Sequence, residues 1–124
     1  MVAPDDRSAR SDPSSLDGVR MRVVATDPGG EVDAAVLFVF AERENLITAS
    51  YRGGAIVDGY LIGTRERTHL NFRYVQANTS QRVESGVSTC EIAMSPGGRM
   101  QLTEHFRWES KPGRGTNVLE EVDV

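Results

Sequence analysis

The sequence predicts an all-β protein: a small antiparallel up-and-down barrel of about eight strands, with a lipocalin-like or calycin-like shape. Apolar and polar residues alternate along most of the chain after Gly18, which is the period of a half-buried strand. Short turns rich in glycine, proline, asparagine and serine separate these stretches, so successive strands are expected to pair antiparallel. No segment holds the apolar stripe of an amphipathic helix over several turns.

The turns fix where each strand ends. Asp27-Pro28-Gly29-Gly30 and Ser95-Pro96-Gly97-Gly98 combine a proline of preset φ with glycines that accept positive φ. Since no helix is predicted to cover an open sheet, closure into a barrel would remove the exposed edges, and a two-sheet sandwich is the alternative. The expected strands are Val19–Thr26, Glu31–Glu42, Leu46–Tyr51, Ala55–Gly63, Thr68–Ala77, Arg82–Met94, Met100–Ser110 and Thr116–Val122.

The 124 residues are expected to form one domain after a short tail. Residues 1–16 are rich in proline, serine, aspartate and arginine and contain little to bury, so they are predicted to be a disordered N-terminal tail. Residues 17–124 are assigned to the barrel. The net charge of −4 disfavours nucleic acid as a partner, because a dedicated binder normally carries a basic face.

Several other classes of protein are also disfavoured. No apolar run approaches the roughly 20 residues that span a membrane, and no apolar stretch follows Met1, so a cytoplasmic protein is expected. His69 and His105 fall in the outward phase without a third ligand at suitable spacing, and the chain has a single cysteine, Cys90. Neither a metal site nor a cofactor is therefore predicted.

The expected seventh strand contains the most informative residue. Glu104 shares the inward phase with Leu102, Phe106 and Trp108. A carboxylate among these apolar side chains must be paired or have a raised pKa, which suits a general acid or base. If its role is purely structural, an internal partner such as Arg73, Arg107 or the Tyr74 hydroxyl is expected.

Two further strands complete a predicted interior. Alternation places Phe72, Tyr74 and Gln76 inside with Leu70, and it places Asp58 and Tyr60 in one phase with Ile56 and Ile62. The glycines of the fourth strand indicate a bulge, sharp coiling or the close approach of another group. An amphipathic cavity for one small organic molecule and a barrel filled by its own side chains remain alternatives. The predicted catalytic residues are Glu104, Tyr74 and Asp58, and the predicted ligand-binding residues are Tyr60, Phe72, Gln76, Phe106, Trp108, Phe38 and Phe40.

The expected second strand is apolar on both faces. Phe38 and Phe40 lie on one side with Val36, whereas Val39 lies on the other with Leu37 and Ala41. An outer barrel face is normally solvated, so the second apolar face is expected to be covered by the tail or by a second copy of the chain. We favour a homodimer.

Several short motifs follow one another along the chain after Gly18. They are Tyr51-Arg52-Gly53-Gly54-Ala55-Ile56, Gly59 with Leu61-Ile62-Gly63, Phe72-Arg73-Tyr74, Gly86 before Cys90-Glu91, Gly98-Arg99-Met100-Gln101-Leu102, Glu104 with Trp108, and Gly115 through Glu120-Glu121. Together these motifs resemble a family of small bacterial lipocalin-like β-barrel proteins that are often labelled "N-acetylglutamate synthase". The resemblance implies a compact barrel with no secure activity. No glycine cluster leads into a helix that could cradle a pyrophosphate, as an acetyl-CoA-dependent synthase would require.

Three functions fit these residues. The first is a pocket protein that binds an apolar or amphipathic metabolite. The second is a cofactor-free cyclase or isomerase that uses interior Glu and Tyr groups as acid and base on a substrate held in a dry cavity. The third is a solid barrel that acts as a protein-interaction module through its outer apolar face.

Overall fold

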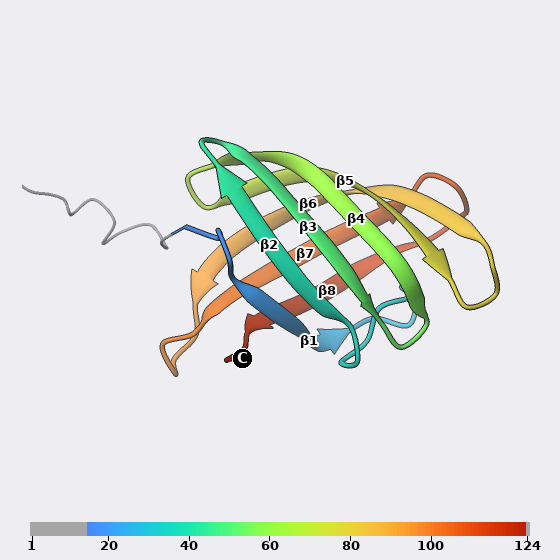
Figure 1. The fold of residues 1–124 in the computed structure, drawn as a ribbon, viewed down its shortest axis with the longest axis horizontal. Helices are drawn as coiled ribbons and strands as arrows, with labels where there is room; N and C mark the ends of the chain where they lie inside the picture. Colours follow the sequence, from blue (N-terminus) through green and yellow to red (C-terminus); the bar gives the residue numbers. More distant parts are fainter. Residues whose placement is uncertain (1–14, 124) are drawn as a thin grey trace, which may run out of the picture.

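The computed structural model describes residues 15–123, which form a closed barrel of eight antiparallel strands (Figure 1). Each strand pairs with its neighbours in the sequence, and β1 pairs with β8 to close the ring. The fold predicted from the sequence is confirmed, and the sandwich alternative is wrong. The strands are β1 (Arg20–Thr26), β2 (Leu37–Arg43), β3 (Leu46–Gly53), β4 (Ile56–Glu66), β5 (His69–Asn78), β6 (Val83–Met94), β7 (Met100–Trp108) and β8 (Arg114–Glu121).

The N-terminal boundary differs slightly from the one expected. Residues 1–14 of the expected tail lie outside the described residues. Leu16, also assigned to that tail, is completely buried, and its backbone N–H donates to Glu42 Oε1 over 2.7 Å. Arg65 pairs with the same carboxylate at 2.9 Å. Leu16 therefore packs into the core at the end of the barrel where β2 and β4 finish.

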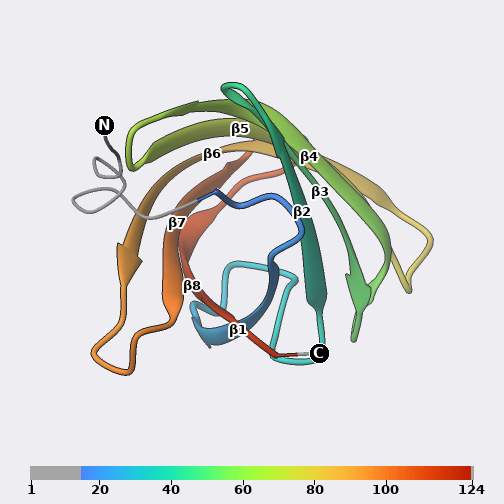
Figure 2. The same cartoon turned by 60° about the vertical axis from the view of Figure 1, so that its left-hand side comes forward.

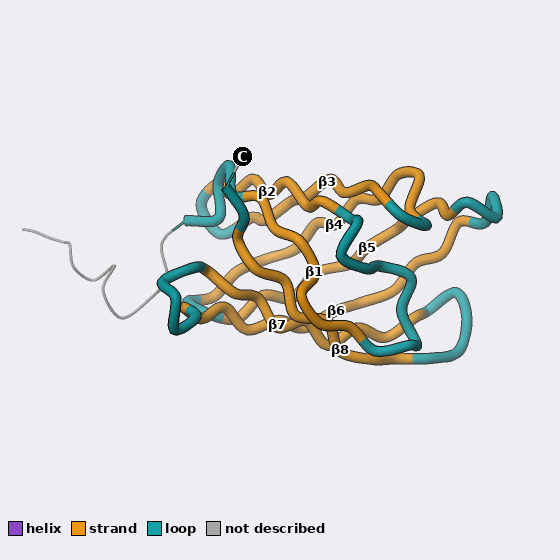
Figure 3. The backbone as a smooth tube through the Cα atoms, turned by 90° about the horizontal axis from the view of Figure 1, so that it is seen from below, coloured by secondary structure: helices purple, strands orange, loops and turns teal. Residues whose placement is uncertain are grey.

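The opposite end of the barrel is the end where residues 27–36 join β1 to β2. Figure 3 shows this connection in teal, crossing from the end of β1 to the start of β2, and Figure 2 shows it in cyan within the ring of strands. The second strand was expected to begin at Glu31, which is wrong for residues 31–36. The Asp27-Pro28-Gly29-Gly30 turn opens a long loop, which we call the mouth loop.

Alternation correctly predicted the inward faces of β5 and β7. Leu70, Phe72, Tyr74 and Gln76 are buried on β5, and Leu102, Glu104, Phe106 and Trp108 are buried on β7. Phe38 and Phe40 of β2 are buried, as is Val36 immediately before the strand, whereas Val39 is exposed and Leu37 is partly buried. The core thus consists of alternating side chains from all eight strands packed inside the closed ring.

The prediction that Asp58 and Tyr60 of β4 face the interior in one phase with Ile56 and Ile62 is wrong. The β4–β5 register shifts between Ile56 and Asp58, so that the phase of β4 changes by one residue after Ile56. Leu61 is buried as a result, whereas the Asp58 side chain is 69% exposed and Tyr60 is 47% exposed. A one-residue slip moves every later side chain to the other face. Asp58 and Tyr60 therefore point to solvent.

Three inward glycines lie opposite aromatic residues on neighbouring strands. The register pairs Gly59 with Tyr51, Gly63 with Phe72, and Gly86 with Tyr74. A Cβ atom on Gly59 would lie 2.3 Å from the Tyr51 ring, and one on Gly86 would lie 2.3 Å from the Tyr74 hydroxyl. These glycines therefore provide space for the chain's own aromatic rings, which lie across the strands and fill the interior.

Candidate functional site

The interior near the mouth loop holds the candidate site. Apolar rings form most of its wall: Tyr74 and Phe106 each meet Trp108 edge to face, with ring centroids 5.4 and 5.9 Å apart. The cavity between these side chains measures about 20 Å³, enough for about one water molecule. The residues that line it are Gly30, Glu31, Val32, Phe38, Tyr51, Leu61, Phe72, Tyr74, Gln76, Glu104, Phe106, Trp108 and Asn117.

Glu104 is held by two neutral donors rather than by an arginine. Ser88 Oγ donates to Glu104 Oε2 over 2.6 Å, and Asn117 Nδ2 donates to Glu104 Oε1 over 3.1 Å. The Thr26 hydroxyl donates to Asn117 Oδ1, which turns the amide N–H₂ toward the carboxylate. None of the partners suggested from the sequence makes this contact.

The surroundings of Glu104 favour its protonated form. Burial raises the pKa of Glu104, and the hydrogen bonds from Ser88 and Asn117 offset only part of that increase. The raised pKa agrees with the expectation for a carboxyl group buried among apolar side chains. The role of Glu104 as an acid or base stays a prediction.

Tyr74 has the only buried side-chain polar atom without a hydrogen-bond partner among the described residues, its hydroxyl oxygen. Burial, followed by the Glu104 and Glu31 charges, raises the pKa of Tyr74, so this hydroxyl remains a protonated donor. The Tyr51 hydroxyl, by contrast, donates to Gln76 Oε1 over 2.6 Å. The Tyr51 hydroxyl therefore already has a hydrogen-bond acceptor, whereas the Tyr74 hydroxyl has none among the described residues.

A second carboxylate closes the mouth. Glu31 of the mouth loop accepts hydrogen bonds from Gln76 Nε2 at 2.9 Å, Asn78 Nδ2 at 2.9 Å and Lys111 Nζ at 2.8 Å. Tyr51 donates to the oxygen of the Gln76 amide, so its N–H₂ points toward Glu31. Backbone N–H groups donate to the oxygen of the Asn78 amide with the same effect.

The balance of forces on Glu31 differs from that on Glu104. Burial alone would raise the pKa of Glu31, but the hydrogen bonds from Lys111, Gln76 and Asn78 and the Lys111 charge together lower it. Lys111 also lies 4.5 Å from the centre of the Trp108 ring, a cation–π distance. The ionised Glu31 carboxylate therefore joins the mouth loop to side chains of the barrel wall.

Backbone contacts hold the mouth loop against the same tryptophan. Trp108 Nε1 donates to the Gly29 carbonyl over 2.9 Å. A Cβ atom on Gly30 would lie 3.1 Å from the end of the Phe106 ring, so the loop backbone packs directly on the interior aromatics. One side of the cavity is thus formed by the mouth loop, whereas strands form the other sides.

The structure brings together most of the residues that the sequence analysis selected. Glu104, Tyr74, Phe72, Gln76, Phe106, Trp108 and Phe38 line one cavity, whereas Phe40 is buried deeper, with its ring centroid 6.2 Å from that of Phe38. Asp58 and Tyr60 lie outside the barrel.

Sequence reasoning missed other residues of the site. Alternation with Leu119 and Ile47 could have placed Asn117 and Tyr51 inside, because these pairs share a phase on β8 and β3. Glu31 and Lys111 gave no such signal, since both belong to loops. No group of three or more His, Cys, Asp or Glu side chains able to hold a metal occurs within residues 15–123. A membrane-spanning helix is likewise absent from that range.

Comparisons with known proteins agree with this architecture. No curated protein and no solved structure shows significant similarity to the chain. The family model described as Avidin-like protein, a family of the calycin superfamily, matches residues 14–122. This match covers the whole described barrel, and the chain therefore belongs to the avidin-like family.

Proposed function

We propose that this barrel binds one small amphipathic organic molecule between Trp108 and Glu104, and that the mouth loop moves aside to admit it. The apolar part of the molecule packs against the Trp108, Phe106 and Phe72 rings, and its polar part meets Tyr74 and Glu104. Family membership supports this proposal, since the avidin-like family binds small ligands such as biotin. The proposal does not include the acetyl-transfer activity that the N-acetylglutamate synthase label would imply.

The unpartnered Tyr74 hydroxyl is the observation that carries the proposal. Leaving a buried polar group without a partner costs about 1–3 kcal/mol, and native interiors rarely tolerate it without a reason. Every other polar side chain of the cavity wall has a partner: Glu31, Tyr51, Gln76, Glu104, Trp108 and Asn117. A ligand with a hydrogen-bond acceptor would supply the missing contact.

Entry of a ligand requires a change of shape. Ordinary ligand pockets measure roughly 300–1,000 Å³, whereas the cavity near the mouth loop measures about 20 Å³. The strands are held by continuous ladders, whereas the middle of the mouth loop is held by Glu31 and by the Trp108–Gly29 bond. The two ends of the loop are fixed separately, because Asp27 and Thr116 exchange two hydrogen bonds and Val36 is completely buried. Displacement of the middle of the loop, with both ends in place, is therefore the route that we propose to a larger cavity.

Titration monitored by tryptophan fluorescence tests the proposal, because Trp108 is the only tryptophan in the chain. We expect biotin, or an amphipathic amide or lactone of similar size, to shift the Trp108 emission saturably. Tyr74→Phe should weaken that binding about tenfold, the equivalent of one hydrogen bond. Tyr60→Phe is the matched control, since Tyr60 lies on the outer surface. Equal affinities for the two variants would contradict the assigned position of the ligand.

A second candidate is a cofactor-free cyclase or isomerase in the same cavity, with Glu104 as acid–base group and Tyr74 as hydrogen-bond donor. The raised pKa of Glu104 favours it. Asp58 is no longer a candidate, because it faces solvent. Once a ligand class is identified, Glu104→Gln should abolish its turnover while binding persists. Unchanged turnover in Glu104→Gln would leave the barrel as a binding protein.

The expected homodimer and the cytoplasmic location stay predictions. Members of the avidin-like family are often oligomers. Val39 on the outer face of β2 is 37% exposed, which leaves a small apolar surface where a second copy could pack. Sedimentation of the natural protein and of Val39→Glu tests this contact: a dimer that the substitution converts to a monomer would support it.

A further inference from the structure

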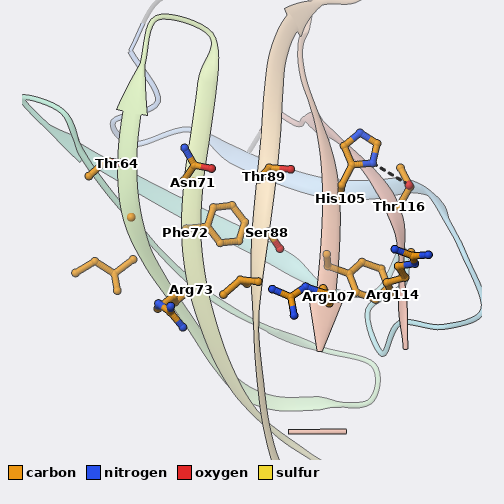
Figure 4. Close-up of a pocket in the computed structure, with 15 residues that line it drawn as sticks. Thr64, Asn71, Phe72, Arg73, Ser88, Thr89, His105, Arg107, Arg114 and Thr116 are labelled. Carbon is orange, nitrogen blue, oxygen red and sulfur yellow. Dashed lines mark hydrogen bonds between the residues drawn. The ribbon is translucent and has the colours of Figure 1, made fainter. Parts of the chain in front are cut away.

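The outer face of β4 to β8 carries two aligned rows of side chains (Figure 4). Strand register places Arg73, Arg107 and Arg114 in one row, with Ile62 and Val87 between and beside them. The adjacent row is polar and includes His105, whose Nδ1 lies 3.1 Å from Thr116 Oγ1. Together the rows line an open groove of about 850 Å³. The polar row is Thr64, Asn71, Thr89, His105 and Thr116.

The charge of this face is not neutralised from within the chain. Arg73 pairs with Glu109 at 2.9 Å. Within residues 15–123, neither Arg107 nor Arg114 takes part in an ion pair. These two arginines lie directly opposite each other on β7 and β8, an arrangement of like charges that destabilises a sheet. An anionic occupant would turn this unfavourable pair into a favourable one.

An apolar patch borders the arginine row. The register places Tyr60 opposite Val75 in the row next to Ile62 and Arg73. Tyr60, Ile62 and Val75 are 47%, 51% and 44% exposed. Tyrosine and arginine beside aliphatic side chains are the composition typical of a protein interface. The same face thus offers both apolar area and guanidinium groups.

We propose that this outer face of β4 to β8 binds an acidic segment of a partner protein, whose carboxylates bridge Arg107 and Arg114 and whose apolar side chains cover Tyr60 and Val75. Guanidinium groups bind carboxylates through paired hydrogen bonds. A second copy docked through the same face would bring two arginine-bearing faces together. Nucleic acid fits poorly, because the chain carries a net charge of −4 and apolar side chains lie beside the arginines on this face.

Fluorescence anisotropy with a labelled peptide of alternating glutamate and leucine tests the proposal at low salt. We expect this peptide to bind the natural protein, and a lysine–leucine peptide not to bind. The double substitution Arg107→Glu with Arg114→Glu should weaken binding at least tenfold, and Tyr60→Ser with Val75→Ser should weaken it by a smaller factor. Arg43→Glu, at the exposed end of β2, is the matched control and should change little. Circular dichroism checks that each variant folds.

Four results would overturn the proposal. The first is absence of binding by the glutamate–leucine peptide, or equal binding by the natural protein and the Arg107/Arg114 variant. The second is complete displacement of the peptide by millimolar inorganic phosphate, which would indicate a small-anion site. The third is tighter binding of a single-stranded RNA oligonucleotide than of the peptide. The fourth is a natural dimer that the Arg107/Arg114 substitutions convert to a monomer, which would assign the face to contact between copies.

Discussion

The two carboxylates of the interior, Glu31 and Glu104, are held in opposite ways. Glu31 accepts hydrogen bonds from a lysine and two oriented amides, and its pKa is lowered. Glu104 accepts hydrogen bonds only from a hydroxyl and an amide, and its pKa is raised. The two carboxylates therefore differ in the form that their surroundings favour. The hydrogen bonds of Glu31 join the mouth loop to the barrel wall, whereas Glu104 is the group that we propose to meet the ligand.

Glu31→Gln should have the largest effect on stability. The glutamine N–H₂ would face either the Gln76 donor or the Asn78 and Lys111 donors, so at least one of these donors would lose its acceptor in either orientation. We expect the free energy of unfolding to fall by about 1.5–3 kcal/mol, the range for hydrogen bonds to a charged group. Urea unfolding measures this change, and acrylamide quenching of Trp108 should increase as the mouth loop loosens. Unchanged stability and quenching would show that the loop is held by other contacts.

Tyr74→Phe should have a smaller effect of the opposite sign. Removing a buried hydroxyl without a partner should stabilise the ligand-free protein by about 1 kcal/mol. Tyr51→Phe, in contrast, should destabilise it by a similar amount, because the Tyr51 hydroxyl bonds Gln76. Thermal unfolding of the two variants compares these changes. Destabilisation by Tyr74→Phe would mean that the hydroxyl already has a partner in solution.

Glu104→Gln should change stability by at most about 1 kcal/mol, since glutamine can accept from Asn117 and donate to the Ser88 hydroxyl. Its pH dependence should distinguish it from Glu31→Gln. The pKa of Glu104 is raised above 4.5, so its stabilising contribution is complete below that pH and is lost as pH rises through the raised pKa. The pKa of Glu31 is lowered below 4.5, so its contribution is present above that pH and is lost as pH falls through the lowered pKa.

Urea unfolding from acidic to mildly alkaline pH therefore separates the two groups. Glu31→Gln should flatten the loss of stability on the acid side, and Glu104→Gln should flatten the loss toward higher pH. If Glu104→Gln instead flattened the acid side, Glu104 would be a stabilised carboxylate and its proposed role as an acid would be wrong.

Asp58→Asn should have the smallest effect. Asp58 and its partner Arg52 are joined at 2.7 Å but are mostly exposed, and such pairs contribute little. We expect a change within about 0.5 kcal/mol and no change in ligand binding. A loss of ligand binding in Asp58→Asn would show that the β4 register differs in solution and that Asp58 faces the cavity, as the sequence pattern suggested.

The sequence was sufficient to predict the barrel and the inward faces of β5 and β7, because strict alternation continues along both strands. It failed at β4, where a register shift after Ile56 reversed the phase. A one-residue bulge leaves the residue types unchanged, so alternation alone does not reveal it.

The candidate site was predicted only where strands build it. Glu104, Tyr74 and Trp108 follow from alternation. Glu31 and Lys111 lie 80 residues apart in two loops, and their contact depends on how the loops fold over the finished barrel. The absence of a partner for the Tyr74 hydroxyl is likewise a property of the packed interior.

Native mass spectrometry of the freshly purified protein, before and after mild denaturation, tests the central claim most directly. We predict a small-molecule adduct that mild denaturation releases. The adduct is either present on purification or formed when a ligand that shifts Trp108 emission is added. Leu61→Phe, which fills the cavity from β4, should lose the adduct while remaining folded. A bare mass under all conditions, or an adduct retained equally by folded Leu61→Phe, would contradict a ligand site inside the barrel.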